Sequence, residues 1–124
     1  MKLLLDTRAA LWWLSEDERF SEATADQLTD ETNQVLLSAV VVWEVAIKRS
    51  LGKLEAPENL ASTLLDAGLQ ALPVSLDHAA AVEQLPWHHR DPFDRMLVAQ
   101  AAIEGAAVVS HDEALQPYEV NLVW

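Results

Sequence analysis

The stretch DPFDRMLVAQAAIEGAAVVS, residues 91–110, contains a helix signal followed directly by a strand signal. Asp91 can cap a helix, Pro92 suits its first position, and glycine, here Gly105, commonly lies just past a helix end. The nearly apolar run that follows, Ala106–Ser110, lacks alternation, which is typical of a strand buried on both faces of a parallel sheet. The stretch therefore predicts a helix that stops at Gly105 and a buried parallel strand after it.

Four further runs of this kind occur in the chain, and helix signals separate them. The predicted strands are Lys2–Leu5, Gln34–Ser38, Ala71–Ser75 and Val120–Val123. The other predicted helices begin at Asp6 or Thr7, Ser21, Ser38, Pro57 and Asp77, and they end near Trp13, Leu28, Ile47, Gly68 and Leu85. The alternation predicts one three-layer α/β domain over residues 1–124, with a central, mainly parallel five-stranded sheet flanked by helices.

The composition excludes several classes of protein. Without cysteine the chain has no disulfide scaffold, no cysteine-bound zinc and no thiol nucleophile. The balance of 8 Lys+Arg against 20 Asp+Glu gives a net charge of −12, which argues against broad, nonspecific binding to nucleic acid. One lysine and three leucines before Asp6 do not make a signal peptide, and no apolar run is long enough for a membrane span. We therefore expect a cytoplasmic protein with no membrane partner.

Glu44 stands out because it is the only charged residue between Glu31 and Lys48 and has apolar neighbours. An unpaired buried carboxylate costs on the order of several kcal/mol, so Glu44 needs a nearby cation, a proton or a route to water. Alternatively, Glu44 pairs with Lys48 one turn later on an exposed helix stripe. We take Glu44 as a candidate site residue.

Other acids lie where strands end or helices begin. Asp6 and Asp112 follow apolar runs, and the carboxyl edge of a parallel sheet is where ligands bind. Asp94 belongs to the first turn of the helix after Asp91, and its charge either favours the helix dipole or faces a cleft, whereas Asp91 is better explained as the helix cap. Ser110 places a hydroxyl near Asp112. Converging carboxylates without cysteine ligands favour Mg²⁺ or Mn²⁺, an arrangement suited to phosphate-ester hydrolysis.

Four segments, in order and spanning essentially the whole chain, resemble PIN-domain ribonucleases of the VapC toxin type. They are Leu3–Thr7 with Ala10–Leu14; Ser38 with Trp43, Glu44, Ile47, Lys48 and Leu51–Leu54; His89–Arg95 with Leu97–Ala101; and Val108–Asp112 with Tyr118 and a closing apolar strand. The resemblance implies a PIN-like fold and one or two Mg²⁺ or Mn²⁺ ions held by Asp6, Glu44, Asp94 and Asp112, with Asp91 a lesser candidate and Ser110 in support. It implies a dimeric endoribonuclease toxin that cuts single-stranded regions of RNA, leaves a 5′-phosphate and is inhibited by a small cognate antitoxin. One departure is Arg8, where this subfamily often has histidine.

The basic and aromatic residues leave alternatives open. Lys48, Arg90 and Arg95 are candidate contacts for RNA phosphates, or they form an ordinary solvated face. His88 and His89 are weak candidates for metal ligands because no third histidine lies nearby. Trp12 and Trp13 cannot both face the core of one helix, so one of them meets a protein partner or an RNA base.

Three rival functions remain for comparison. A receiver-type signalling domain would need an acidic pair near the first strand, an aspartate ending a middle strand and a late lysine, but Ser75 ends the third run and no lysine follows Lys53. A haloacid-dehalogenase-like phosphatase would need a second aspartate where Arg8 stands. A catalytically inert PIN-like interaction module that only binds its partner stays an alternative, although no candidate acid is replaced.

Overall fold

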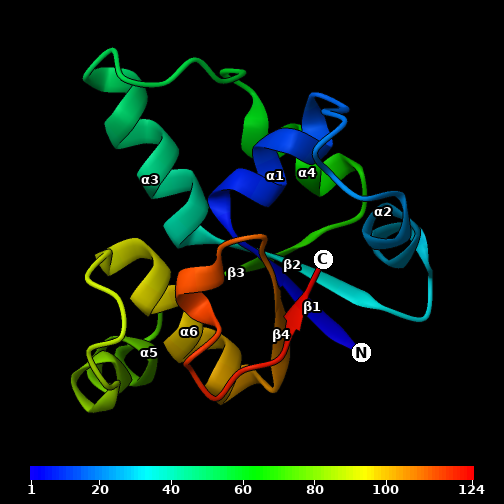
Figure 1. The fold of residues 1–124 in the computed structure, drawn as a ribbon. Helices are drawn as coiled ribbons and strands as arrows, with labels where there is room; N and C mark the ends of the chain where they lie inside the picture. The colour runs from blue at the N-terminus through cyan, green and yellow to red at the C-terminus, as the bar shows by residue number, and fades with distance from the viewer.

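The computed structural model describes all 124 residues and contains a sheet of five parallel strands in the order β3-β2-β1-β4-β5 (Figure 1). The strands are β1 (Lys2–Leu5), β2 (Gln34–Ser38), β3 (Gln70–Leu72), β4 (Ala106–Val109) and β5 (Leu122–Val123). The helices are α1 (Thr7–Leu14), α2 (Glu22–Thr29), α3 (Ala39–Ser50), α4 (Leu60–Asp66), α5 (Leu76–Ala81) and α6 (Pro92–Glu104), with short 3₁₀ helices at Val82–Gln84 and Glu113–Leu115. The predicted fold class is confirmed.

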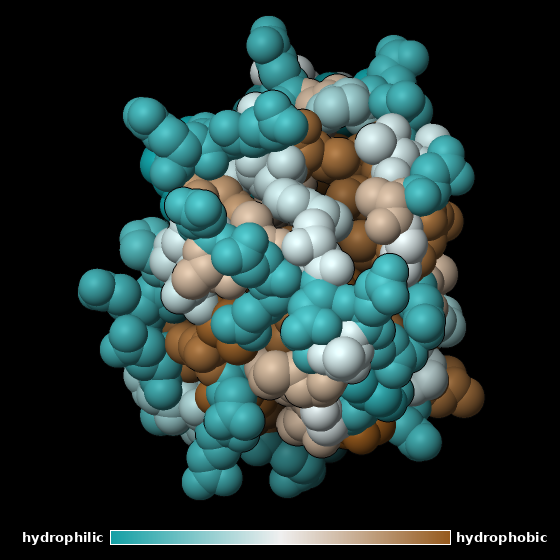
Figure 2. Space-filling model, turned by 90° about the vertical axis from the view of Figure 1, so that its right-hand side faces the viewer, coloured by the Kyte–Doolittle hydropathy of each residue, from teal (hydrophilic) through white to brown (hydrophobic).

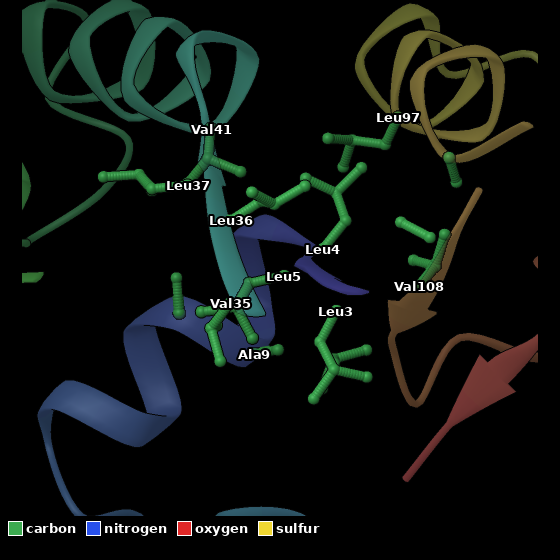
Figure 3. Close-up of a cluster of buried hydrophobic side chains, with 14 of the residues drawn as sticks. Leu3, Leu4, Leu5, Ala9, Val35, Leu36, Leu37, Val41, Leu97 and Val108 are labelled. Carbon is green, nitrogen blue, oxygen red and sulfur yellow. The ribbon is translucent and has the colours of Figure 1, made fainter. Parts of the chain in front are cut away.

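The helices cover both faces of the sheet, which gives three layers. Leu4 and Leu36, on neighbouring strands, point toward Val41 of α3 and Leu97 of α6, while Ala9 of α1 packs on the opposite side (Figure 3). Because successive side chains of a strand point to opposite faces, a central strand must be apolar throughout to be buried in this way. This is why the leucines of β1 and the valines of β4 form unbroken runs rather than alternating ones.

Polar side chains predominate on the face of the molecule that Figure 2 draws, and hydrophobic residues come to the surface in patches between them. None of the helices combines the length and the apolar character needed to cross a membrane.

Most helices begin directly after the capping residue that the sequence predicts. Asp6, Ser21, Ser38 and Asp91 each accept a hydrogen bond from a backbone N–H in the first turn of the helix that follows. Gly105 ends α6 with φ of 66°, a left-handed conformation that other residues adopt only at a cost. The division of residues 34–50 at Ser38 into a strand and a helix is confirmed.

Several predicted boundaries are wrong by a few residues. β5 begins at Leu122 rather than at Val120, and α3 continues to Ser50 rather than ending near Ile47. β3 ends at Leu72 rather than at Ser75, because Pro73 has no N–H to continue the ladder. Ser75 instead caps α5 in place of Asp77, and its amide N–H donates to Nδ1 of His78, which completes a capping box. The helix predicted to open at Pro57 begins at Leu60.

The sheet order determines where a ligand can bind. From β1 the chain builds outward through β2 and β3, and then it crosses back to place β4 on the other side of β1. The loops that follow β1 and β4 therefore diverge, which leaves a crevice at the carboxyl ends of these two strands. Asp6 follows β1 directly and Asp112 lies three residues beyond the end of β4.

Candidate active site

A cleft of about 370 Å³ opens at this carboxyl edge of the sheet. Its lining includes all four of the acids predicted as catalytic or metal-binding, together with the lesser candidate: Asp6, Glu44, Asp94, Asp112 and Asp91. These side chains come from α3, from the first turn of α6 and from the residues that follow β1 and β4. The fold therefore brings together residues that are far apart in the sequence.

Asp6 is buried at the bottom of this arrangement and is fixed by the helix that it caps. Its Oδ1 accepts the backbone N–H of Ala9 at 2.7 Å. Burial raises the pKa of Asp6, whereas the side chain of Ser110 and the N–H of Ala9 act to lower it. The Ser110 hydroxyl also accepts the backbone N–H of Asp112 at 3.0 Å, so this residue connects the two strand ends that supply Asp6 and Asp112.

Asp94 and Asp112 lie on either side of His89. The Nε2 atom of His89 is 2.9 Å from Oδ2 of Asp94 and 3.9 Å from Oδ2 of Asp112. One potential ligand atom from each of these three residues lies within 4.8 Å of the other two. Burial, together with the charges of Asp91 and Asp6, raises the pKa of Asp94 to about 6 although a hydrogen bond to His89 acts to lower it. This is the tightest group of potential metal-binding atoms in the cleft.

Glu44 is only 5% exposed, and two contacts hold its carboxylate. Oε2 accepts from Nζ of Lys48 at 2.5 Å and Oε1 accepts from Oγ1 of Thr7 at 2.6 Å. The expectation of a nearby cation is met by Lys48, but the pair does not lie on an exposed stripe. Glu44 instead forms the α3 wall of the cleft, beside the group formed by His89, Asp94 and Asp112.

Asp91 acts as the cap of α6. Its Oδ1 accepts the backbone N–H groups of Phe93 and Asp94 at 2.8 and 3.1 Å. The second oxygen is not used by the cap and the residue lines the cleft, so its charge contributes to the raised pKa of Asp94. This agrees with its lower rank among the predicted ligands.

The predicted RNA contact of Arg95 is wrong, because the side chain is only 2% exposed. Its guanidinium donates to the backbone carbonyls of Pro86, Val82 and Leu85 at 2.9, 3.1 and 3.3 Å. It also packs 3.8 Å from the centre of the Trp87 ring. Arg95 therefore holds the segment that precedes α6 in place and does not face the cleft. Lys48 lines the cleft, and Arg90 is exposed next to His89.

Several residues of the cleft were not assigned to it from the sequence. His89 was set aside because it had no histidine partner, yet its partners are the two aspartates. Arg8, Trp12, His111 and Trp124 also line the cleft. Neither spacing nor periodicity could reveal His89, because only the folded loop between Leu85 and α6 carries it to the carboxyl end of β4.

The fold and the cleft define a class: parallel α/β domains with an acid-lined cleft at the carboxyl ends of the strands. The family model described as PIN domain matches residues 3–120, and the chain belongs to this family. The resemblance noted in the sequence is thereby confirmed, and the match assigns the chain to PIN domains rather than to receiver domains.

Two curated relatives are ribonucleases of Mycobacterium tuberculosis. Ribonuclease VapC22 is 27% identical over 119 residues, which cover 94% of this chain and 91% of the relative. Ribonuclease VapC16 is 46% identical over 52 residues, which cover 40% of this chain and 37% of the relative. Among solved structures, this chain is similar to VapBC2 from Rickettsia felis, which was solved bound to a DNA fragment from the promoter. The TM-score is 0.75 and the identity 15%, and the match covers 99% of this chain and 98% of that chain. This last similarity concerns the fold.

Proposed function

We propose that this chain is a divalent-metal-dependent endoribonuclease and the toxin component of a type II toxin–antitoxin system, with a single PIN domain over residues 1–124. The observation that carries the proposal is the convergence of Asp6, Asp94 and Asp112, with Glu44, in one cleft of a PIN domain. The ribonuclease names of both curated relatives support the same chemistry.

The donor set of the cleft fits a hard divalent cation. Carboxylate oxygens are the ligands that Mg²⁺ and Mn²⁺ prefer, and the cleft contains no thiolate. Burial raises the pKa of Asp6 and of Asp94, so their ionised carboxylates are disfavoured here, and a bound cation would favour them. We therefore assign Asp6, Asp94 and Asp112 as ligands, with Glu44 completing a site for one or two ions. A bound divalent ion polarises a phosphoryl oxygen and lowers the pKa of a coordinated water.

The chain's own residues prepare this site for in-line hydrolysis. Asp6 is held by its capping bond and Glu44 by Lys48 and Thr7, so neither carboxylate has to be ordered when the substrate binds. Ser110 supports the ligands through its bond to the backbone of Asp112. Hydrolysis at this site leaves a 5′-phosphate on one RNA fragment and a 3′-hydroxyl on the other.

The proposed partners are RNA, a cognate antitoxin and a second copy of the chain. Lys48 at the cleft and the exposed Arg90 are the remaining predicted phosphate contacts. The match to VapBC2 from Rickettsia felis supports an antitoxin partner. The resemblance to VapC toxins supports a homodimer. An RNA substrate agrees with the predicted cytoplasmic location.

The test is RNA cleavage by the wild-type chain and by Asp6→Asn, with Mg²⁺ or with EDTA. Asparagine also caps helices, so the variant is expected to stay folded while cleavage falls below detection. Asp26→Asn, which removes the same charge from the exposed surface of α2, serves as the control and should cleave as the wild type does. Undiminished cleavage by Asp6→Asn would overturn the site assignment, and no cleavage by the wild type on any single-stranded RNA would favour an inert interaction module.

A further inference from the structure

The basic residues of the cleft differ in their freedom to bind a phosphate. Of the eight lysines and arginines, only Arg8 and Lys48 line the cleft. Lys48 is already paired with Glu44 at 2.5 Å, whereas Arg8 makes no ion pair within 4.0 Å. Arg8 is therefore the one permanently charged cation at the cleft without a carboxylate partner, in a chain whose net charge is −12.

Arg8 stands beside an aromatic wall. Its guanidinium carbon lies 5.8 Å from the ring centre of Trp12, one turn later in α1. Trp12 in turn meets Trp124 edge to face, with ring centres 5.7 Å apart, and the ring of His111 lies 5.1 Å from Trp124 at a tilt of 38°. All four side chains line the same cleft as Asp6 and Asp112.

Two further side chains pack against this wall. Phe20, which is buried, packs edge to face on Trp124 at 5.1 Å, and the guanidinium of Arg19 lies 4.4 Å from the Trp12 ring. Trp12 and Trp124 are only partly buried, so each ring keeps some surface for the cleft. An aromatic surface next to a guanidinium without a carboxylate partner is the combination that binds single-stranded nucleic acid without reading its sequence, by base stacking and phosphate contact.

We infer that Arg8, Trp12 and Trp124 form a nucleotide subsite next to the acidic cluster, in which Arg8 binds a phosphate that flanks the scissile bond and the two tryptophans hold the adjoining base. The inference rests on the proposed ribonuclease function and names the part of the substrate that this side of the cleft receives. In this subsite Arg8, rather than Arg95, supplies the positive charge next to the acidic cluster. It also gives an acidic protein a local means of holding RNA, since the phosphate contact is short-range and the stacking contact is uncharged.

The first experiment measures binding without cleavage. Asp6→Asn serves as the background, and a fluorescein-labelled single-stranded RNA of mixed sequence is titrated by fluorescence anisotropy at KCl concentrations from about 50 to about 200 mM. In this background Arg8→Gln should weaken binding and reduce the slope of log K against log salt by about 0.7, the value for one phosphate contact on a single strand. Lys2→Gln removes a charge near the amino end of β1, at the opposite edge of the sheet, and should change neither quantity.

The second experiment tests the aromatic wall. Trp12→Leu and Trp124→Leu should each weaken binding by about 5-fold or more, the loss expected for one stacked base. Trp13→Leu is the matched control, because Trp13 is the neighbour of Trp12 in α1 but lies against a different hollow, beside α2 and β2. It disturbs packing in the same helix and should leave RNA binding unchanged. Trp124→Phe keeps an aromatic face and should bind like the background protein.

Kinetics separate this subsite from the catalytic group. In the otherwise wild-type chain, Arg8→Gln should raise KM for RNA while kcat stays within about 3-fold, because the lost contact is made equally before and during the reaction. If the wild type cleaves RNA and the Arg8 and tryptophan variants keep its KM and salt slope, the subsite is wrong and the nuclease proposal stands. If the wild type does not cleave, the nuclease proposal fails, and the two binding titrations then show only whether Arg8 and the tryptophans bind RNA. Arg8 is exposed, so its variant tests the inference even if a tryptophan variant fails to fold.

Discussion

Replacing Asp94 by asparagine is expected to stabilise the protein at pH 7 in the absence of metal, although it removes a proposed metal ligand. Burial and the charges of Asp91 and Asp6 raise the pKa of Asp94 from its ordinary value of 3.8 to about 6. A raised pKa means that the folded chain holds the protonated carboxyl more tightly than the unfolded chain does. The ionised carboxylate is therefore a source of instability at neutral pH.

The sign and the window follow from the two pKa values. Below about pH 3 the carboxyl is largely protonated in both states, so it has almost no effect on the free energy of unfolding. Between about pH 3 and pH 6 the folded chain binds more protons, so this free energy falls as the pH rises, and at pH 7 the loss is complete. At 1.36 kcal/mol per pH unit the loss would be about 3 kcal/mol. Screening in an open cleft reduces it to about 2 kcal/mol, and the lost interaction of Asp94 with the α6 dipole offsets about 0.5 kcal/mol.

Asp94→Asn should therefore raise the free energy of unfolding by about 1.5 kcal/mol at pH 7 and by almost nothing at about pH 3. Urea unfolding in EDTA, followed by tryptophan fluorescence, measures both values. Asp26→Asn, on the exposed surface of α2, controls for the general benefit of removing one negative charge. Added Mg²⁺ should stabilise the wild type more than Asp94→Asn, since the wild type keeps the ligand. A variant no more stable than the wild type at pH 7 in EDTA, or one whose full advantage persists at about pH 3, would refute the reasoning.

Two further substitutions separate function from stability. Glu44→Gln should abolish metal-dependent RNA cleavage while changing the free energy of unfolding by less than about 1 kcal/mol. The change in stability is small because glutamine still accepts from Thr7 and the partly exposed Lys48 regains water. Cleavage assays and urea unfolding measure the two effects, and retained cleavage would contradict the role of Glu44. Arg95→Met should lower the free energy of unfolding by about 3 kcal/mol, since three carbonyl acceptors lose their donor. The RNA affinity of the folded variant should equal that of the wild type. A weaker affinity without loss of stability would restore Arg95 as an RNA contact.

The local structure was largely predictable because its causes are local. Asp91, Pro92 and Gly105 define α6 by capping and backbone preference, which depend on a few neighbouring residues. The division at Ser38 was predictable for the same reason, since a serine hydroxyl that accepts the N–H of Val40 favours a helix start. β3 was predicted too long because an apolar run does not show which N–H groups are missing from the ladder.

The acids of the site were predictable as individuals, but their neighbours were not. Asp6 and Asp112 follow strands, and all parallel strands of one sheet end at the same edge, so convergence followed from topology. Arg95 was misplaced because one helical position, about 100° of rotation from Asp94, separates a side chain that faces the cleft from one buried under the preceding loop. His89 was overlooked because its contacts with Asp94 and Asp112 depend on how that loop folds.

By itself, the sequence determined the alternating strands and helices, the caps, the absence of thiol chemistry and the positions of the four acids. These properties depend on residue type and on interactions between near neighbours. Only the tertiary structure decided that Glu44 is buried against Lys48 and Thr7, that Arg95 supports a loop and that Arg8 faces the cleft beside two tryptophans. The contacts of Glu44 with Thr7, of Arg95 with Val82 and of Trp12 with Trp124 join residues from separate elements, and their geometry exists only after the helices have packed on the sheet and the water between them has been excluded.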